Sequence, residues 1–172
     1  MLTRRLLIAA AAAPLLAGCG FALRQAPDFA FRSIYVELPS GNAASGHELQ
    51  RQLEITGKLQ VITDAADRNK AEVALQVLQE ARQRVVVGRD AAGNVTEFQL
   101  RFRLRFRVRT PAGKEVLPEV EIMRQIDQSY SDTAALSKDA EAQMLFTDMQ
   151  SDVVQQVLRR LAAIKLEPRN DS

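Results

Sequence analysis

The chain has 172 residues, of which 47% are hydrophobic and 26% are charged, and its formal net charge is +2 at pH 7. These proportions are typical of one globular domain and exclude a collagen, a long disordered chain and a polytopic membrane protein. The sequence contains one His, one Cys and no Trp. A metal site with several His or Cys ligands, a CxxC redox pair and a disulfide framework are therefore excluded, and we expect neither a metal nor a cofactor.

The N-terminal segment, residues 1–18, is predicted to be a lipoprotein signal peptide. Arg4 and Arg5 precede an apolar run over residues 6–16, which is too short to cross a bilayer as a helix and is typical of a secretory signal. The sequence LAGC, which ends at Cys19, resembles the bacterial lipobox, in which cleavage falls before the Cys and its thiol receives a diacylglyceryl group. The alternative is an ordinary signal peptide with an incidental Cys.

The mature chain would then begin at Cys19, with residues 19–30 as a lipidated linker, residues 31–166 as one domain and residues 167–172 as a frayed tail. Gly20 stands where an inner-membrane retention signal would have Asp, so the resemblance to lipoprotein sorting signals indicates a lipid-anchored, periplasm-facing protein of the outer membrane. Loss of Arg4 and Arg5 leaves equal numbers of basic and acidic residues, so net charge does not indicate an anionic partner.

The first part of the domain is predicted to form a strand, a short helix and a further short strand. Residues 31–38 alternate with period two. Ser45 and Glu48 have the spacing of a capping box, and Gly57 suits the left-handed position after a helix. Residues 59–62 are a candidate short strand, and His47 in the first helical turn is expected to be solvated.

Three long strands are predicted in the centre of the chain, over residues 71–87, 96–110 and 115–130, joined by turns at 90–94 and 111–113. Each strand alternates apolar and polar residues, so each has one buried face. Short turns between such strands predict an antiparallel meander.

Five arginines share one face of the middle strand: Arg101, Arg103, Arg105, Arg107 and Arg109. The 111–113 turn sets a register in which Arg109 faces Glu115, Arg105 faces Glu119 and Arg103 faces Glu121, each pair stabilising the sheet by about 0.2 to 1 kcal/mol. Most of this stripe is therefore predicted to be a solvated, charge-paired surface.

The hairpin formed by residues 71–87 and 96–110 is predicted to leave cations without a carboxylate partner. With a four-residue turn, Arg82 lies opposite Arg101 and Arg84 opposite Gln99, while Arg89 lies at the tip. Like charges directly opposed are destabilising, and Arg binds phosphate oxygens in a bidentate way. A phosphorylated, anionic ligand is one interpretation of this cluster, and an unremarkable surface is the other.

From Thr133 the pattern becomes helical for about thirty residues, with Ser131 and Asp132 as candidate caps and Glu167-Pro168 as the end. The apolar residues recur at helical spacing and are predicted to pack on the sheet: Leu145, Met149, Val153, Val157, Leu161 and Ile164. The predicted fold class is α+β, an antiparallel or mixed sheet of about four strands with two helices packed on one face.

Several segments together resemble the LptE family of lipopolysaccharide-assembly lipoproteins. These are the lipobox with GFALR at residues 20–24, the long central hairpin, YSDTAALSKDAE at 130–141, and DM at 148–149 before a Gln-rich amphipathic helix. The resemblance implies a non-enzymatic outer-membrane lipoprotein that plugs the β-barrel LptD as a heterodimer partner and binds lipopolysaccharide on its way to the outer leaflet. It also implies ligand-binding roles for Arg89 and Lys138.

The register and the resemblance together predict that Arg82, Arg84, Arg89, Arg101 and Lys138 bind lipid A phosphates, the resemblance supplying the ligand and Lys138, with no catalytic residue, no metal and no nucleic acid. A hydrolase that uses Glu119 and Glu121 is disfavoured, because arginine partners would hold both carboxyls ionised. A lipoprotein binding module of another envelope lipid-transport complex remains the alternative function.

Overall fold

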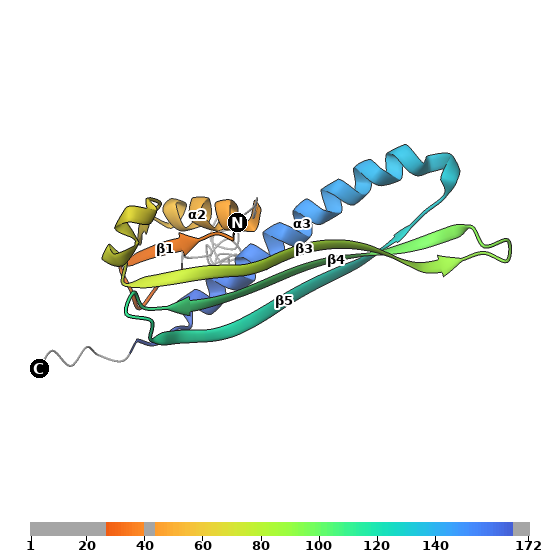
Figure 1. Cartoon of the computed structure of the whole chain (residues 1–172). Helices are drawn as coiled ribbons and strands as arrows, with labels where there is room; N and C mark the ends of the chain where they lie inside the picture. The colour runs from red at the N-terminus through yellow and green to blue at the C-terminus, as the bar shows by residue number, and fades with distance from the viewer. Residues whose placement is uncertain (1–26, 40–43, 167–172) are drawn as a thin grey trace, which may run out of the picture.

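The structure, a computed structural model, describes residues 27–39 and 44–166 (Figure 1). The predicted signal peptide, Cys19, Gly20 and the predicted tail at 167–172 lie outside the described residues. None of the helices in the described part is long and apolar enough to cross a membrane.

The described chain forms a five-stranded sheet with two α-helices packed against it, which confirms the predicted α+β class (Figure 1). The elements in chain order are β1 (Ser33–Glu37), α2 (Ala44–Thr56), β2 (Gln60–Ile62), the 3₁₀ helix η1 (Ala65–Lys70), β3 (Val73–Arg89), β4 (Val95–Arg109), β5 (Glu115–Ser129), the 3₁₀ helix η2 (Asp132–Ala134) and α3 (Ala135–Ala162).

The strand order is β2-β1-β3-β4-β5. β1 is parallel to β2 and β3, whereas β3, β4 and β5 form the predicted antiparallel meander. The tip of the β3–β4 hairpin and the beginning of α3 lie at the same end of the molecule, which we call the distal end, while α2 and β1 lie at the other end (Figure 1).

The hydrophobic core lies between the helices and one face of the sheet, the helix side. Alternate β4 residues from Leu100 to Val108 are fully buried there, together with the apolar residues of α3 from Met149 onward. The intervening β4 arginines lie on the opposite face, which we call the open face, because a β-strand turns successive side chains to opposite sides.

The predicted capping box of α2 is wrong. The helix already begins at Ala44, so Ser45 is a buried residue of its first turn, and the Ser45 hydroxyl has no hydrogen-bond partner among the described residues. The Ser45 backbone N–H instead donates to Glu80 Oε2 of β3 at 2.9 Å. Gly57 has the predicted left-handed conformation, with φ at +63°, and His47 is exposed as expected.

The predicted β3–β4 register is correct from Ala74 to Val77 and wrong by one residue from Gln79 to Val86, and two more irregularities lie beside Gly88 near the hairpin tip. An irregularity between Val77 and Gln79 makes Leu78 an extra residue in β3, so that Arg82 pairs with Phe102 rather than Arg101. A shift by one residue turns every later side chain of the strand to the other face.

The predicted β4–β5 register is also wrong over most of its length, because two irregularities, one on each side of Val108, together shift the pairing by two residues. Arg105 lies opposite Glu121 and Arg103 opposite Met123. A shift by two keeps every side chain on its face, so two of the three predicted ion pairs form diagonally, Arg105 with Glu119 and Arg103 with Glu121 at 3.4 Å. Arg109 lies opposite Glu115 as predicted, but the predicted ion pair between their side chains is wrong, because none forms in the described structure.

Candidate functional site

The bulge at Leu78 decides which face of the sheet carries the cations of β3. Before it, Val73, Leu75 and Val77 fill the core, and after it Glu80, Arg82 and Arg84 occupy the same side. Two arginines that the sequence places on the open face therefore lie on the helix side, beneath α3. The predicted cluster of Arg82, Arg84 and Arg101 on a single face does not exist.

Arg84 lies between two aromatic rings and the start of α3. Its guanidinium carbon is 3.9 Å from the ring centroid of Phe98 and 5.2 Å from that of Tyr130, and the two rings meet edge to face. Nη1 donates to Asp139 Oδ1 at 2.6 Å. Cation–π contacts orient the guanidinium plane, and the Arg84 side chain as a whole is 28% exposed to solvent.

Lys138 lies on α3 immediately before Asp139, and it binds the end of β5. Its Nζ is 3.2 Å from Ser129 Oγ and 2.8 Å from Glu141 Oε2. The backbone carbonyl of Lys138 accepts from Nε2 of the buried Gln128 at 2.8 Å. The hydrogen bond from Lys138 lowers the pKa of Glu141 below its ordinary value.

Arg82 is the second cation on the helix side, further along α3. It donates to Gln150 Oε1 at 2.6 Å, lies 3.9 Å from Glu80 Oε1, and contacts the rings of Phe102 and Phe146. Its single carboxylate contact is long, so its charge is only partly neutralised.

Arg89 occupies the hairpin tip, where Nη1 donates to the backbone carbonyl of Gly93 at 2.7 Å. The turn itself is held by Asp90, which accepts from the backbone of Ala92 and from the side chain and backbone of Asn94. These hydrogen bonds, led by that of the Asn94 side chain, lower the pKa of Asp90. The Arg89 guanidinium has a carbonyl partner and no carboxylate partner among the described residues.

Arg101 lies apart from the other predicted ligand residues. It pairs with Gln83 of β3 and Gln125 of β5 on the open face, and its Nε donates to Gln99 Oε1 at 2.7 Å. Of the five predicted residues, Arg84 of β3 and Lys138 of α3 both lie at the first turns of α3. Arg82 and Arg89 lie on β3 on either side of Arg84. Arg101 lies apart from these four, on the open face.

Sequence reasoning missed the groups that orient these cations. Phe98, Tyr130 and Asp139 surround Arg84, and Arg124 of β5 forms an ion pair with Asp152 of α3 at 2.8 Å. One signal was present for Arg124, a charge at an even position of β5 between the apolar Ile122 and Ile126.

The arrangement suits an amphipathic anion. The guanidinium of Arg84 and the ammonium of Lys138 are held by single carboxylates that are 61% and 42% exposed, so a phosphate group of higher charge can replace them. Large apolar side chains are exposed beside them, Val86 opposite Phe98 and Leu136 on the first turn of α3. Charge and apolar surface therefore meet at the distal end.

Comparison with solved structures supports this fold. A solution NMR structure of an uncharacterized lipoprotein B from Nitrosomonas europaea is 31% identical, with 84% of this chain and 91% of that one covered and a TM-score of 0.67. Rare lipoprotein B from Shewanella oneidensis is 20% identical over 77% of this chain and 95% of its own, with a TM-score of 0.62, and at that identity it shows the fold alone.

A minor lipoprotein from Acinetobacter baumannii shares the fold in the same way, with 21% identity, 82% of this chain and 100% of that one covered, and a TM-score of 0.61. Among the curated proteins, none matches the chain. The family model LptE, described as lipopolysaccharide-assembly, matches residues 31–161, which is most of the chain. The chain therefore belongs to the LptE, or lipopolysaccharide-assembly, family.

Proposed function

We propose that this protein is an outer-membrane lipoprotein that binds lipopolysaccharide and acts as plug and assembly partner of the β-barrel translocon LptD. Its membership of the lipopolysaccharide-assembly family is the observation that carries the proposal. In this account, acyl chains on Cys19 hold the domain at the periplasmic face of the membrane, and about 0.8 kcal/mol per buried CH₂ makes the anchorage durable. The function requires no covalent chemistry.

The proposed ligand site is the distal end on the helix side. Arg84 and Lys138 approach the lipid A phosphates by charge-assisted hydrogen bonds, in exchange for their ion pairs with Asp139 and Glu141. Arg89 and Arg82 extend the positive surface along β3 in both directions. Exposed Val86 and Leu136, 36% and 87% accessible, offer apolar contact to the acyl chains.

Lipopolysaccharide binding by charge-neutralised variants tests this assignment. The Arg84→Gln and Lys138→Gln double variant is expected to bind purified lipopolysaccharide at least about tenfold more weakly, because each hydrogen bond between charged groups contributes about 1.5 to 3 kcal/mol. Arg51→Gln is the matched control, since Arg51 lies on α2 and, within the described residues, pairs with Glu48 alone. Equal affinity of the double variant and the control would remove Arg84 and Lys138 as ligands.

A further variant decides which face of the sheet carries the ligand. Arg101→Gln removes the one predicted ligand residue that lies on the open face. The helix-side assignment predicts a smaller loss of affinity for Arg101→Gln than for Arg84→Gln. An equal or larger loss would move the proposed site to the open face.

A further inference from the structure

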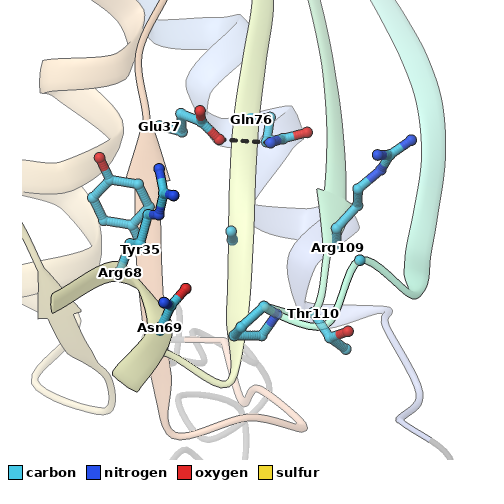
Figure 2. A pocket seen from close by; sticks show the side chains of 10 residues that line it. Tyr35, Glu37, Arg68, Asn69, Gln76, Arg109 and Thr110 are labelled. Carbon is cyan, nitrogen blue, oxygen red and sulfur yellow. Dashed lines mark hydrogen bonds between the residues drawn. The ribbon is translucent and has the colours of Figure 1, made fainter. Parts of the chain in front are cut away.

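A hollow of about 290 Å³ lies on the open face of the sheet, at the end of the molecule opposite the hairpin tip (Figure 2). It spans β1, β3, η1 and the turn after β4. Figure 2 shows Tyr35 and Arg68 on one side, Arg109 on the other, and the hydrogen bond from Gln76 to Glu37 between them. Asn69 and Thr110 add further polar groups to the rim.

The two arginines of this hollow have no acceptor. Within the described part of the chain, neither guanidinium makes a hydrogen bond or an ion pair, although β4 neighbours such as Arg105 and Arg107 are bound by Glu119 and Gln76. The Nε of Arg109 is buried and has no partner. An unsatisfied buried donor costs about 1 to 3 kcal/mol, so an acceptor that reaches Arg109 in the hollow would relieve this cost.

Glu37 does not neutralise the pair. Its Oε2 accepts from Gln76 Nε2 at 2.6 Å, and Gln76 Oε1 accepts from Arg107 Nε at 2.6 Å. These two hydrogen bonds hold the Glu37 carboxylate of β1 beside β3, between the two unpaired guanidinium groups. Among the residues that line the hollow, two cations stand against one carboxylate, and Glu115, which lies opposite Arg109 in the sheet, forms no ion pair with it in the described structure. The polar rim of the hollow suits an oxygen-rich ligand.

We propose that this hollow binds a phosphate monoester group between Arg68 and Arg109. Guanidinium groups bind phosphate oxygens in a bidentate geometry, and a phosphate of nearly two negative charges outweighs the repulsion of Glu37 better than a carboxylate does. The site is distinct from the one proposed for lipopolysaccharide. β4, which joins the two ends, has fifteen residues and is about 50 Å long.

Titration with inorganic phosphate, followed by calorimetry and by NMR of the backbone amides of Ala74, Thr110 and Gly113, tests the site. Saturable binding is expected, with an affinity that falls at least about tenfold in the Arg68→Gln and Arg109→Gln double variant. Arg159→Gln with Arg160→Gln is the matched control, since these two exposed arginines lie at the end of α3 and line no part of the hollow.

Two further arms identify the source of the phosphate. Tighter binding of glycerol 3-phosphate than of inorganic phosphate indicates a lipid headgroup, and equal binding indicates the free ion. Acetate that binds as tightly as phosphate overturns the proposal, as does the absence of saturable binding or an equal loss in the control variant. Should the double variant not fold, the single Arg68→Gln variant, at an exposed residue, carries the same expectation.

Phosphate binding in the hollow can be tested independently of lipopolysaccharide binding. The Arg68→Gln and Arg109→Gln variant is expected to bind lipopolysaccharide like the wild-type protein, because both residues lie at the far end of β4 from Arg84 and Lys138. A loss of lipopolysaccharide affinity in this variant would show that the two ends share one ligand, which contradicts a separate site.

Discussion

At the scale of single residues, Glu80 joins the sheet to the first turn of α2. Its carboxylate accepts the backbone N–H of Ser45 at 2.9 Å, and its side chain is only 10% exposed. The first N–H groups of a helix have no partner within the helix, and they form the positive end of its dipole. A nearly buried carboxylate at this position supplies both an acceptor and a favourable charge.

Glu80→Ala is therefore expected to lower the free energy of unfolding by about 1 to 2 kcal/mol, the usual range for the loss of a helix cap. Glu80→Gln keeps an acceptor oxygen without the charge and is expected to lose less. Urea unfolding of the two variants and the wild-type protein measures both effects. Wild-type stability in Glu80→Ala would show that the Ser45 N–H finds another acceptor.

The sequence could not reveal this cap. Ser45 and Glu48 satisfy the local pattern of a capping box, but Glu80 lies 35 residues further along the chain and takes the N–H that the pattern assigns to a neighbouring side chain. Glu48 instead binds Arg51 and Gln52. A local motif gives way here to a contact that exists only after the sheet has formed.

The Lys138–Glu141 pair predicts a dependence of the distal end on pH. The hydrogen bond from Lys138 lowers the pKa of Glu141, so the pair contributes stability above the ordinary glutamate pKa of about 4.3 and loses it as the pH falls through the lowered value. In Lys138→Gln, the pKa of Glu141 is expected to rise toward 4.3. NMR titration of the Glu141 carboxyl carbon measures it, and an unchanged pKa would contradict the pairing.

At the scale of elements, the two halves of α3 are attached to the sheet by different forces. From Met149 onward, six residues of the helix are buried in the core: Met149, Val153, Val154, Val157, Leu158 and Leu161. Before Met149, only Ala142 and Phe146 are buried, and the contacts to the sheet include the polar ones of Lys138 and Asp139. Exposed ion pairs contribute less than buried apolar surface.

We therefore expect the backbone amides of residues 139–147 to exchange with solvent much faster than those of residues 153–161, because local opening needs less free energy where little apolar surface is buried. Hydrogen exchange followed by NMR at neutral pH measures both segments in one experiment. Uniform protection along the whole helix would show that the polar contacts hold the first half as firmly as the core holds the second.

The sequence predicts the long elements well and their register poorly. Alternation of apolar residues placed β3, β4 and β5 within two residues of their observed bounds, because one face of each strand is buried for much of its length. The extra residue in β3 left only a faint trace, the adjacent apolar pair Val77 and Leu78. A bulge is fixed by the pairing of two strands, so a pattern within one strand does not locate it.

At the scale of the whole molecule, the bulge determines what the distal end presents. Without the switch of face, Arg82 and Arg84 would lie on the open face beside Arg101, as the sequence predicts. With it, they lie beneath α3, and the first turn of that helix adds Lys138. The sequence named the cations of the candidate site, whose ligand-binding role stays a prediction, whereas the face they occupy and their aromatic neighbours required the assembled sheet.

The central claim is that this lipoprotein works as the partner of an outer-membrane β-barrel that delivers lipopolysaccharide. Affinity purification of the tagged full-length protein from outer membranes in mild detergent, at native expression, tests it most directly. We expect one large integral β-barrel protein to co-purify in equimolar amount, together with lipopolysaccharide, and Arg51→Gln to behave like the wild-type protein. Recovery of the lipoprotein alone, or with envelope proteins other than a β-barrel, would contradict the claim.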